Sequence, residues 1–391
     1  MSALRHLRTR MHVNRSIPLL SRSMFCHFSL IATLSLGQLA AQAPVDLVNW
    51  QAENYPAVNG FANGQWTVAA NGLSVNQSVN GQPTLFLSDF PALMTVVEGQ
   101  ITTGSGDNDY VGFAIGFDPG DSSNVAADYL LVDWKQGTQN FNFNAPSCSA
   151  GGVALEGLAV SRVTGIPSAD EFWQHNDTDD TCSPLGQGLT ELQRGATLGS
   201  SNWVDNVTYT FRFEFLGSRL LVFVDGVLEL DVSGSFSDGR FAFYNFSQAN
   251  VTYAAFTQAT AASTEIYGSA CSVGAPLALG GTLPVLGTTW SLSGSNIDPI
   301  SPTALFFFGS ARIQPGFDLS VIGAGGCFAY TNGNLGAFAA AVSGGNASYD
   351  LPIPSNPALG GSVLYTQMVA FSTATALGLV TSNGFAGTLG L

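Results

Sequence analysis

The sequence predicts an all-β protein made of two β-sandwiches in succession. Apolar and polar residues alternate along many short stretches, as in residues 208–215, where aromatic side chains take one face and polar groups the other. Glycine is abundant at 45 residues, and turn signals such as Asp225-Gly226 separate the apolar runs. No stretch of helical length carries apolar residues at a 3.6-residue period. The 46% hydrophobic content argues against disorder, since it is enough to form a core.

The first part of the chain is typical of a secretory signal peptide. Five arginines precede a short apolar run, residues 25–36, and small residues follow it up to Ala43. The apolar run is shorter than the ~20 residues that cross a bilayer. We therefore predict a signal peptide over 1–43, with cleavage after Ala41 or Ala43, and an extracellular mature chain without a transmembrane segment.

Residues 44–260 are predicted to form the first sandwich. Pairs of apolar runs joined by tight turns indicate antiparallel strands, with a hairpin at Asp225-Gly226. The expected strands are residues 94–103, 111–117, 129–136, 153–163, 207–214, 220–224, 227–232, 240–245 and 251–257.

A joint of small residues, 259–264, leads to a second half of different composition. From residue 266 to 391 the charged side chains are Asp298, Arg312, Asp318 and Asp350. Short apolar runs separated by glycine, asparagine and proline predict a smaller β-sandwich over 266–391.

The charge of the mature chain excludes some classes of function. Without residues 1–43 the chain has seven basic and 27 acidic residues, a formal net charge of −20. Such a chain repels nucleic acid and anionic membranes, both of which require basic patches. Calcium ions or cationic partners suit it better.

Four cysteines remain after signal removal: Cys148, Cys182, Cys271 and Cys327. An even number of cysteines in an exported chain favours disulfides over metal-bound thiolates. Three pairings are possible, and joining neighbours within each half gives Cys148–Cys182 and Cys271–Cys327. Free buried thiols are the alternative.

An acidic triplet at residues 107–109 is the candidate metal site. Asp107 and Asp109 flank Asn108, so on an extended segment both carboxylates point to one side. A hard cation with oxygen ligands relieves the repulsion of two such carboxylates. Calcium needs six to eight oxygens, and we expect Asp118, Asp121 or Asp133 to complete the shell. A second acidic cluster, residues 177–180, is better explained as a solvated loop.

Enzymatic interpretations find little support in the sequence. His175 is the only histidine of the mature chain, and no Gly-x-Ser-x-Gly motif stands on a strand-to-helix turn. Glu229 and Asp231 are predicted on one face, but Gly234 stands where glycosidases of this fold often have a third acid. We therefore predict that the protein is not an enzyme. A glycan-active hydrolase is the alternative. Three tryptophans could stack on sugar rings, although core packing is the commoner role: Trp134, Trp173 and Trp203.

Three stretches of the first half, in order, resemble the C-terminal lectin-like domain of thrombospondins. They are residues 107–117, 129–136 and 239–248. The resemblance implies a concanavalin-like jelly roll, calcium binding, and adhesion to an extracellular protein or glycan. It also places Trp134 and Lys135 in a stretch implicated in cell-surface binding, although Asp133 replaces an apolar family residue there. The segments around Cys148 and Cys182 are insertions relative to the family.

The second half resembles a C-terminal module of exported bacterial proteins. The matching residues are 267–271, 326–327, 353–357 and 380–384. That resemblance implies export but no activity.

Overall fold

A computed structural model describes residues 42–56, 60–104, 106–143, 151–179, 182–271 and 275–391. Residues 1–41 of the predicted signal peptide lie outside the described residues. Within the described ranges, no helix is both long and apolar enough to cross a membrane. The predicted all-β fold is confirmed, since strands dominate both halves and α1 (Ala169–Gln174) is a single short helix.

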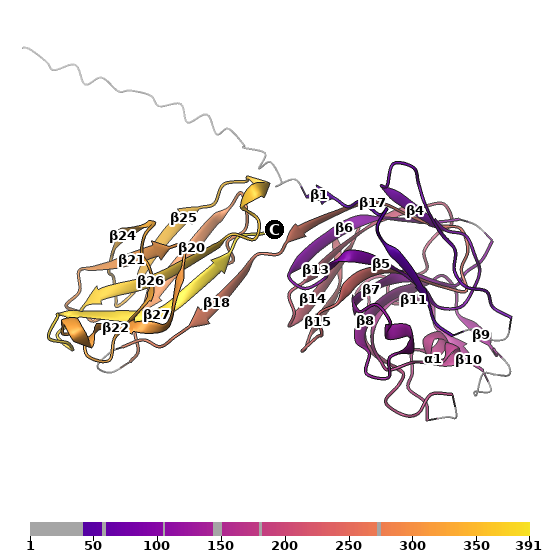
Figure 1. Cartoon of the computed structure of the whole chain (residues 1–391), viewed down its shortest axis with the longest axis horizontal. Helices are drawn as coiled ribbons and strands as arrows, with labels where there is room; N and C mark the ends of the chain where they lie inside the picture. The colour runs from indigo at the N-terminus through magenta and orange to yellow at the C-terminus, as the bar shows by residue number, and fades with distance from the viewer. Residues whose placement is uncertain (1–41, 57–59, 105, 144–150, 180–181, 272–274) are drawn as a thin grey trace, which may run out of the picture. The chain divides into compact units, whose positions relative to one another are not determined.

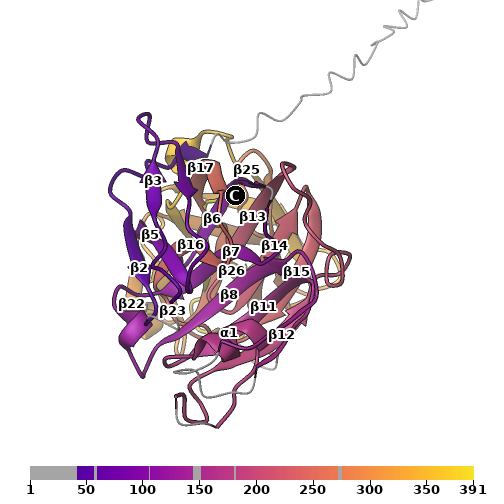
Figure 2. The same ribbon diagram turned by 90° about the vertical axis from the view of Figure 1, so that its right-hand side faces the viewer.

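The first half is a sandwich of two antiparallel sheets (Figures 1 and 2). Sheet A has the order β15 (Val227–Ser233), β14 (Arg219–Val224), β13 (Thr208–Phe215), β6 (Thr95–Thr103), β17 (Val251–Thr260), β4 (Ser74–Gln77) and β3 (Trp66–Val68), with β1 (Ala43–Pro44) paired to β17. Sheet B has the order β12 (Leu189–Arg194), β11 (Gly157–Thr164), β8 (Asp128–Lys135), β7 (Tyr110–Phe117), β16 (Arg240–Phe246), β5 (Thr84–Pro91) and β2 (Gln51–Asn54).

Aromatic side chains fill the space between the two sheets. Phe113 of sheet B packs against Phe213 and Tyr253 of sheet A, with ring centroids 4.7 and 5.7 Å apart. Gly99 on β6 lies under Phe256, where a Cβ atom would fall 2.4 Å from the ring. The half-buried strands that the period-two pattern predicts are therefore confirmed, because the apolar face of each sheet supplies this core.

Sheet B is also covered on its other face. The helix α1 and the hairpin of β9 (Gln139–Phe141) and β10 (Gly152–Ala154) lie over it, as Figure 1 shows. This covering layer holds a second aromatic cluster, which includes Tyr110, Tyr129, Phe143, Phe172, Trp173, Tyr244 and Phe246. Strands β7 and β8 are therefore buried on both faces. Along β8, Leu130, Val132 and Trp134 point into the sandwich core, whereas the alternate residues point into the covering layer.

The predicted hairpin is confirmed, and one predicted strand is wrong. Asp225 and Gly226 both have positive φ, 49° and 81°, as a tight two-residue turn requires, and they join β14 to β15. The predicted strand over 153–163 is two strands in different sheets, β10 and β11. The break falls at residues 155–156, directly before Gly157, whose positive φ of 110° suits a change of chain direction where β11 begins.

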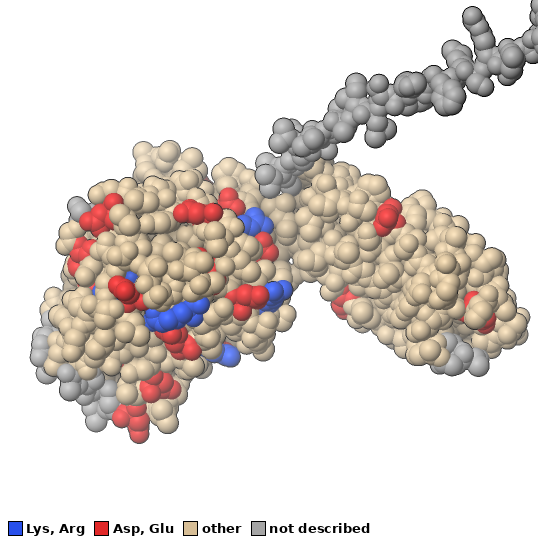
Figure 3. Space-filling view, turned by 180° about the vertical axis from the view of Figure 1, so that it is seen from behind, with Lys and Arg blue, Asp and Glu red and all other residues tan. Residues whose placement is uncertain are grey.

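The second half is a smaller sandwich with a core of its own. One sheet has the order β18 (Ser263–Tyr267), β27 (Leu379–Thr388), β26 (Val363–Phe371), β21 (Thr303–Gly309) and β24 (Gly336–Ala341). The other has the order β19 (Ala278–Gly281), β20 (Thr289–Ser295) and β25 (Ala347–Pro352), while β22 (Arg312–Asp318) pairs with β23 (Phe328–Thr331). The core between them contains Trp290, Phe306, Met368 and Phe385. Charged side chains are sparse on this half in the view of Figure 3.

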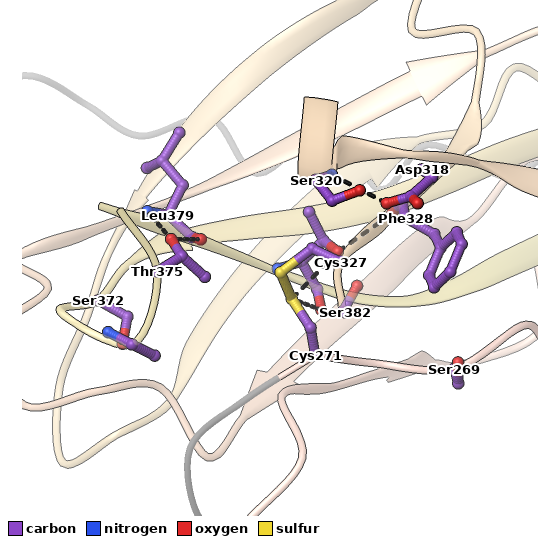
Figure 4. The surroundings of a disulfide bond; sticks show 12 residues. Ser269, Cys271, Asp318, Ser320, Cys327, Phe328, Ser372, Thr375, Leu379 and Ser382 are labelled. Carbon is purple, nitrogen blue, oxygen red and sulfur yellow. Dashed lines mark hydrogen bonds between the residues drawn. A yellow bond between two sulfur atoms is a disulfide. The ribbon is translucent and has the colours of Figure 1, made fainter. Parts of the chain in front are cut away.

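The predicted Cys271–Cys327 disulfide is confirmed (Figure 4). It joins residues 56 apart in sequence, and both cysteines lie in the core of the second sandwich. Beside it, the Thr381 amide donates a hydrogen bond to the Cys271 sulfur at 3.0 Å. Cys182 is also disulfide-bonded, but Cys148, its predicted partner, lies outside the described residues.

Candidate functional site

The structure separates the six predicted calcium ligands into three places. Asp107, Asn108 and Asp109 precede β7, whereas Asp118 and Asp121 follow its other end. An extended segment rises ~3.3 Å per residue, so the two groups are about 30 Å apart. Asp133 lies within β8 and faces the covering layer. Residues 107–109 lie together at one end of β7, Asp118 and Asp121 lie together at the other, and no place holds more than three of the six predicted ligands.

Residues 107–109 belong to a set of loops at one end of the first sandwich. We call this the loop end, and define it as residues 78–82, 104, 106–109, 136–138, 204–207 and 247–250. Backbone hydrogen bonds connect these loops, from Gly104 N to Asn250 O (2.8 Å) and from Ser247 N to Gly81 O (2.7 Å). Side chains connect them as well. The Gln136 amide donates to Asp205 at 3.0 Å, and the Asp109 N–H donates to the Gln248 side chain at 2.9 Å.

Asp109 is neutralised by Lys135, the only lysine of the chain. The Lys135 Nζ lies 2.6 Å from Asp109 Oδ1, 2.9 Å from the Asn108 carbonyl oxygen and 3.3 Å from Gln139 Oε1. It also lies 4.6 Å from the centre of the Trp173 ring. The side chain is 0% exposed. Burial lowers the pKa of Lys135, and the nearby Asp109 carboxylate opposes that shift.

Asp107 is the half-buried carboxylate of the pair. It accepts hydrogen bonds from the Asn80 side-chain amide and, at 3.0 Å, from the Asn108 backbone N–H. Burial raises the pKa of Asp107, and the negative charge of Asp109 raises it further. Asp107 and Asp109 thus lie together at the loop end, and the buried ammonium group of Lys135 on β8 contacts Asp109 from below it.

These residues do not fit a calcium ion. Calcium requires six to eight oxygen ligands at 2.3–2.6 Å, usually with several carboxylates. No cluster of three or more acidic, histidine or cysteine side chains suited to a metal occurs among the described residues. One of the two available carboxylates is already bound to a buried cation, which repels a second cation.

Asp118 and Asp121 stabilise a turn. Asp121 accepts hydrogen bonds from the Asp118 N–H (2.8 Å) and from the Asn124 side chain (2.9 Å). The Glu53 carboxylate binds the N–H groups of Gly120 and Ser122, both at 2.9 Å. Burial raises the pKa of Asp118. Their hydrogen bonds fix residues 118–124, including the 3-10 helix Asp121–Ser123.

Asp133 belongs to a buried charged network that the sequence analysis did not identify. Its Oδ2 atom lies 3.1 Å from His175 Nε2, while His175 Nδ1 lies 3.3 Å from Glu191, which binds Arg194 at 2.9 Å. Burial alone would lower the pKa of His175, but the charges and hydrogen bonds of Asp133 and Glu191 outweigh it and raise that pKa to about 9. The imidazole is therefore charged at neutral pH. A single aspartate in an apolar strand was the available signal, because such a residue needs a partner.

The predicted binding residues Trp134 and Lys135 are both in the interior. Trp134 packs in the sandwich core, and its indole N–H donates to the Ser201 carbonyl at 2.7 Å. Trp173 and Trp203 are each 1% exposed. These tryptophans contribute to packing, and none presents a ring face to a sugar in this structure.

Glu229 and Asp231 do not form the predicted same-face pair. The pairing of β14 and β15 contains a β-bulge, in which Val222 pairs with Leu230 and Phe223 with Leu228, leaving Glu229 as the extra residue. The buried Glu229 carboxylate accepts hydrogen bonds from the N–H groups of Thr197 (2.8 Å) and Leu198 (3.0 Å). Asp231 is exposed and binds Arg219 at 2.7 Å. The bulge makes this prediction wrong.

A comparison with protein families identifies the first sandwich. The family model for the thrombospondin C-terminal region matches residues 62–261, just over half of the chain. The chain belongs to the thrombospondin C-terminal region family. The matched range covers β3 to β17, and therefore the loop end and every strand of the two sheets except β1 and β2.

Solved structures resemble about half of the chain, and only distantly. The carbohydrate-binding module CBM66 from Bacillus subtilis is 14% identical, with a TM-score of 0.33, over 52% of this chain and 98% of that chain. The VIP36 exoplasmic/lumenal domain, in a Ca²⁺/mannose-bound form, is 10% identical with a TM-score of 0.30, over 54% and 81% of the chains. LamAcat from Zobellia galactanivorans is 11% identical with a TM-score of 0.31, over 54% and 89%. No curated protein matches the chain.

Proposed function

We propose that this protein is an extracellular, adhesion-type binding protein that recognises a glycan or a protein surface through its thrombospondin C-terminal domain. One observation carries the proposal: the family match spans the first sandwich, residues 62–261. The Cys271–Cys327 disulfide supports an oxidising compartment, in agreement with the predicted signal peptide.

The loop end is the surface on which we place the binding. Its exposed side chains include the amides Asn80, Asn206 and Asn250 and the apolar Val204 and Val207, with Asp107 half exposed among them. Amide and carboxylate groups on a rigid set of loops suit hydrogen bonding to sugar hydroxyls or to a polar protein surface. The loop end contains no arginine or lysine, so we expect a neutral or cationic partner rather than an anionic one.

A glycan-active hydrolase finds less support. The carboxylates that the sequence offered for catalysis are engaged elsewhere, Glu229 in a buried turn and Asp231 in a surface ion pair. A glycosidase needs two carboxyl groups directed at one substrate bond, which these two residues do not provide.

Binding of the full-length mature chain to a glycan array and to immobilised extracellular proteins tests the proposal. We expect Asn80→Ala and Asp107→Ala to weaken binding with little change in melting temperature. Asp350→Ala, which removes an exposed carboxylate of the second sandwich, is the matched control. Equal binding by all of these variants would refute the placement at the loop end, and release of reducing sugar from a bound glycan would favour the hydrolase.

A further inference from the structure

Two carboxylates at the start of β7 require a counter-charge. Asp107 and Asp109 are two residues apart; burial raises the pKa of Asp107, and the negative charge of Asp109 raises it further. Asp109 is 3% exposed, so water does little to screen it. A nearby cation stabilises a buried carboxylate of this kind.

Lys135 meets this requirement from the neighbouring strand. In the pairing of β7 and β8, Lys135 lies opposite Tyr110, the residue that follows Asp109. This register brings the ammonium group to 2.6 Å from Asp109 Oδ1, and the Asn108 carbonyl and Gln139 side chain complete its hydrogen bonds. The rings of Tyr110 and Trp173 lie 5.6 and 4.6 Å from the nitrogen, and both suit a buried cation.

We infer that Lys135 is the built-in counter-ion of the acidic loop and takes the place of the predicted calcium ion, so that the domain holds residues 107–109 in position without a metal. Its ammonium group is enclosed by the covering layer and bound to three oxygen atoms. A divalent ion at Asp109 would have to separate this group from its carboxylate partner and leave it buried beside the rings of Tyr110 and Trp173. This inference does not depend on the proposed function.

The charge left after this pairing lies on Asp107. One ammonium group balances one of the two carboxylates, and the second is half exposed at the loop end. Because the Asp107 carboxyl group is half exposed, it stays available to a partner, whereas Asp109 and Lys135 serve the fold.

Thermal melting of the full-length mature chain tests the inference. One sample contains EDTA, one contains calcium chloride at about 5 mM, and one contains magnesium chloride at the same concentration. The ionic strength is matched so that screening does not differ between samples. We expect the melting temperature to be the same in all three samples within about 1 °C. We also expect calorimetric titration with calcium chloride to give the same result for the unmodified chain and for the Asp107→Asn/Asp109→Asn variant. A calcium-dependent rise that this double variant abolishes would overturn the inference.

Removal of the lysine is the second arm. Lys135→Met keeps the aliphatic length but leaves Asp109 buried and unpaired, so we expect a fall in melting temperature on the order of 10 °C. Adding Asp109→Asn to this variant should raise the melting temperature again, because the orphaned charge is gone. Arg219→Met, which breaks an exposed ion pair, is the control and should have little effect. If the double variant melts lower than Lys135→Met alone, Lys135 is not the counter-ion of Asp109. Should Lys135→Met fail to fold, the metal titration of the unmodified chain still decides the question.

Discussion

The buried pair of His175 and Asp133 makes the stability of the first sandwich depend on pH. The pKa of His175 is raised from 6.5 to about 9, because Asp133 and Glu191 together outweigh the effect of burial. A raised pKa means that the folded state binds the proton more tightly than the unfolded chain does. The resulting stabilisation is fully present below about pH 6.5 and is lost as the pH rises through about 9. A shift of ~2.5 units corresponds to about 3 kcal/mol.

The groups around His175 make loss of its proton destabilising. Asp133 and Glu191 face its two nitrogens, Arg194 binds Glu191, and the Tyr110 ring lies 5.2 Å from the imidazole. Burial raises the pKa of Asp133, and its Oδ1 atom accepts no hydrogen bond within the described part of the chain. Once His175 is neutral, Asp133 therefore remains as a buried carboxylate without a counter-charge.

Fluorescence-detected melting between pH 6 and pH 10 is a suitable assay, because five of the six tryptophans precede residue 261 and report on the first sandwich. We expect the melting temperature to fall by about 6–12 °C from pH 6.5 to pH 9.5. His175→Asn is the matched variant, since asparagine tolerates the left-handed backbone at this position, where φ is 53°. At pH 6.5 this variant should have a lower melting temperature than the unmodified chain. Its melting temperature should then fall little as the pH rises to 9.5. Equal slopes for the two proteins would refute the role of His175.

Three further predictions concern the stability of the first or the second sandwich by itself. Replacing Cys271 and Cys327 by serine should lower the unfolding free energy of the second sandwich by about 4 kcal/mol, for a loop of 56 residues, as measured by denaturant titration. Glu229→Gln should cost about 1–3 kcal/mol of stability, because its carboxylate accepts buried N–H groups, with no effect on glycan binding in the array. Gly99→Ala should cost several kcal/mol because its Cβ would lie 2.4 Å from a buried ring, whereas Gly280→Ala, which meets nothing within 4 Å, should be neutral. A harmless Gly99→Ala would contradict the sheet spacing.

The strands of the first sandwich could be predicted because their period-two pattern is visible in single stretches such as residues 208–215. The covering layer over sheet B could not. Strands β7 and β8 are buried on both faces, so they read as continuous apolar runs and give no sign of which element lies on which side. The helix that covers them has six residues, too few for a helical stripe to appear in the sequence.

The candidate site shows the limit of spacing as evidence. Two carboxylates two residues apart do share a side, and residues 107–109 are together as expected. Spacing does not reveal which ligands lie at the same end of a strand, and β7 runs between Asp109 and Asp118. Nor does it reveal the register of β7 against β8, which brings Lys135 to Asp109. The single lysine and the single mature histidine were the usable signal, because a charged residue in an apolar strand is seldom buried alone.

The two buried ion pairs limit which surfaces of the domain are open to the proposed partner. Asp133 and Lys135 lie on the same face of β8, and each is paired within the covering layer, to His175 and to Asp109. Opening that face would expose an aromatic cluster and separate both pairs, at a cost of several kcal/mol for each. A ligand therefore cannot use this face of sheet B without partial unfolding. The other face of sheet B forms the sandwich core, which leaves the outer face of sheet A and the loops and edges of the sandwich for recognition. This physical constraint, together with the half-exposed Asp107 and its amide neighbours, is why we place recognition at the loop end.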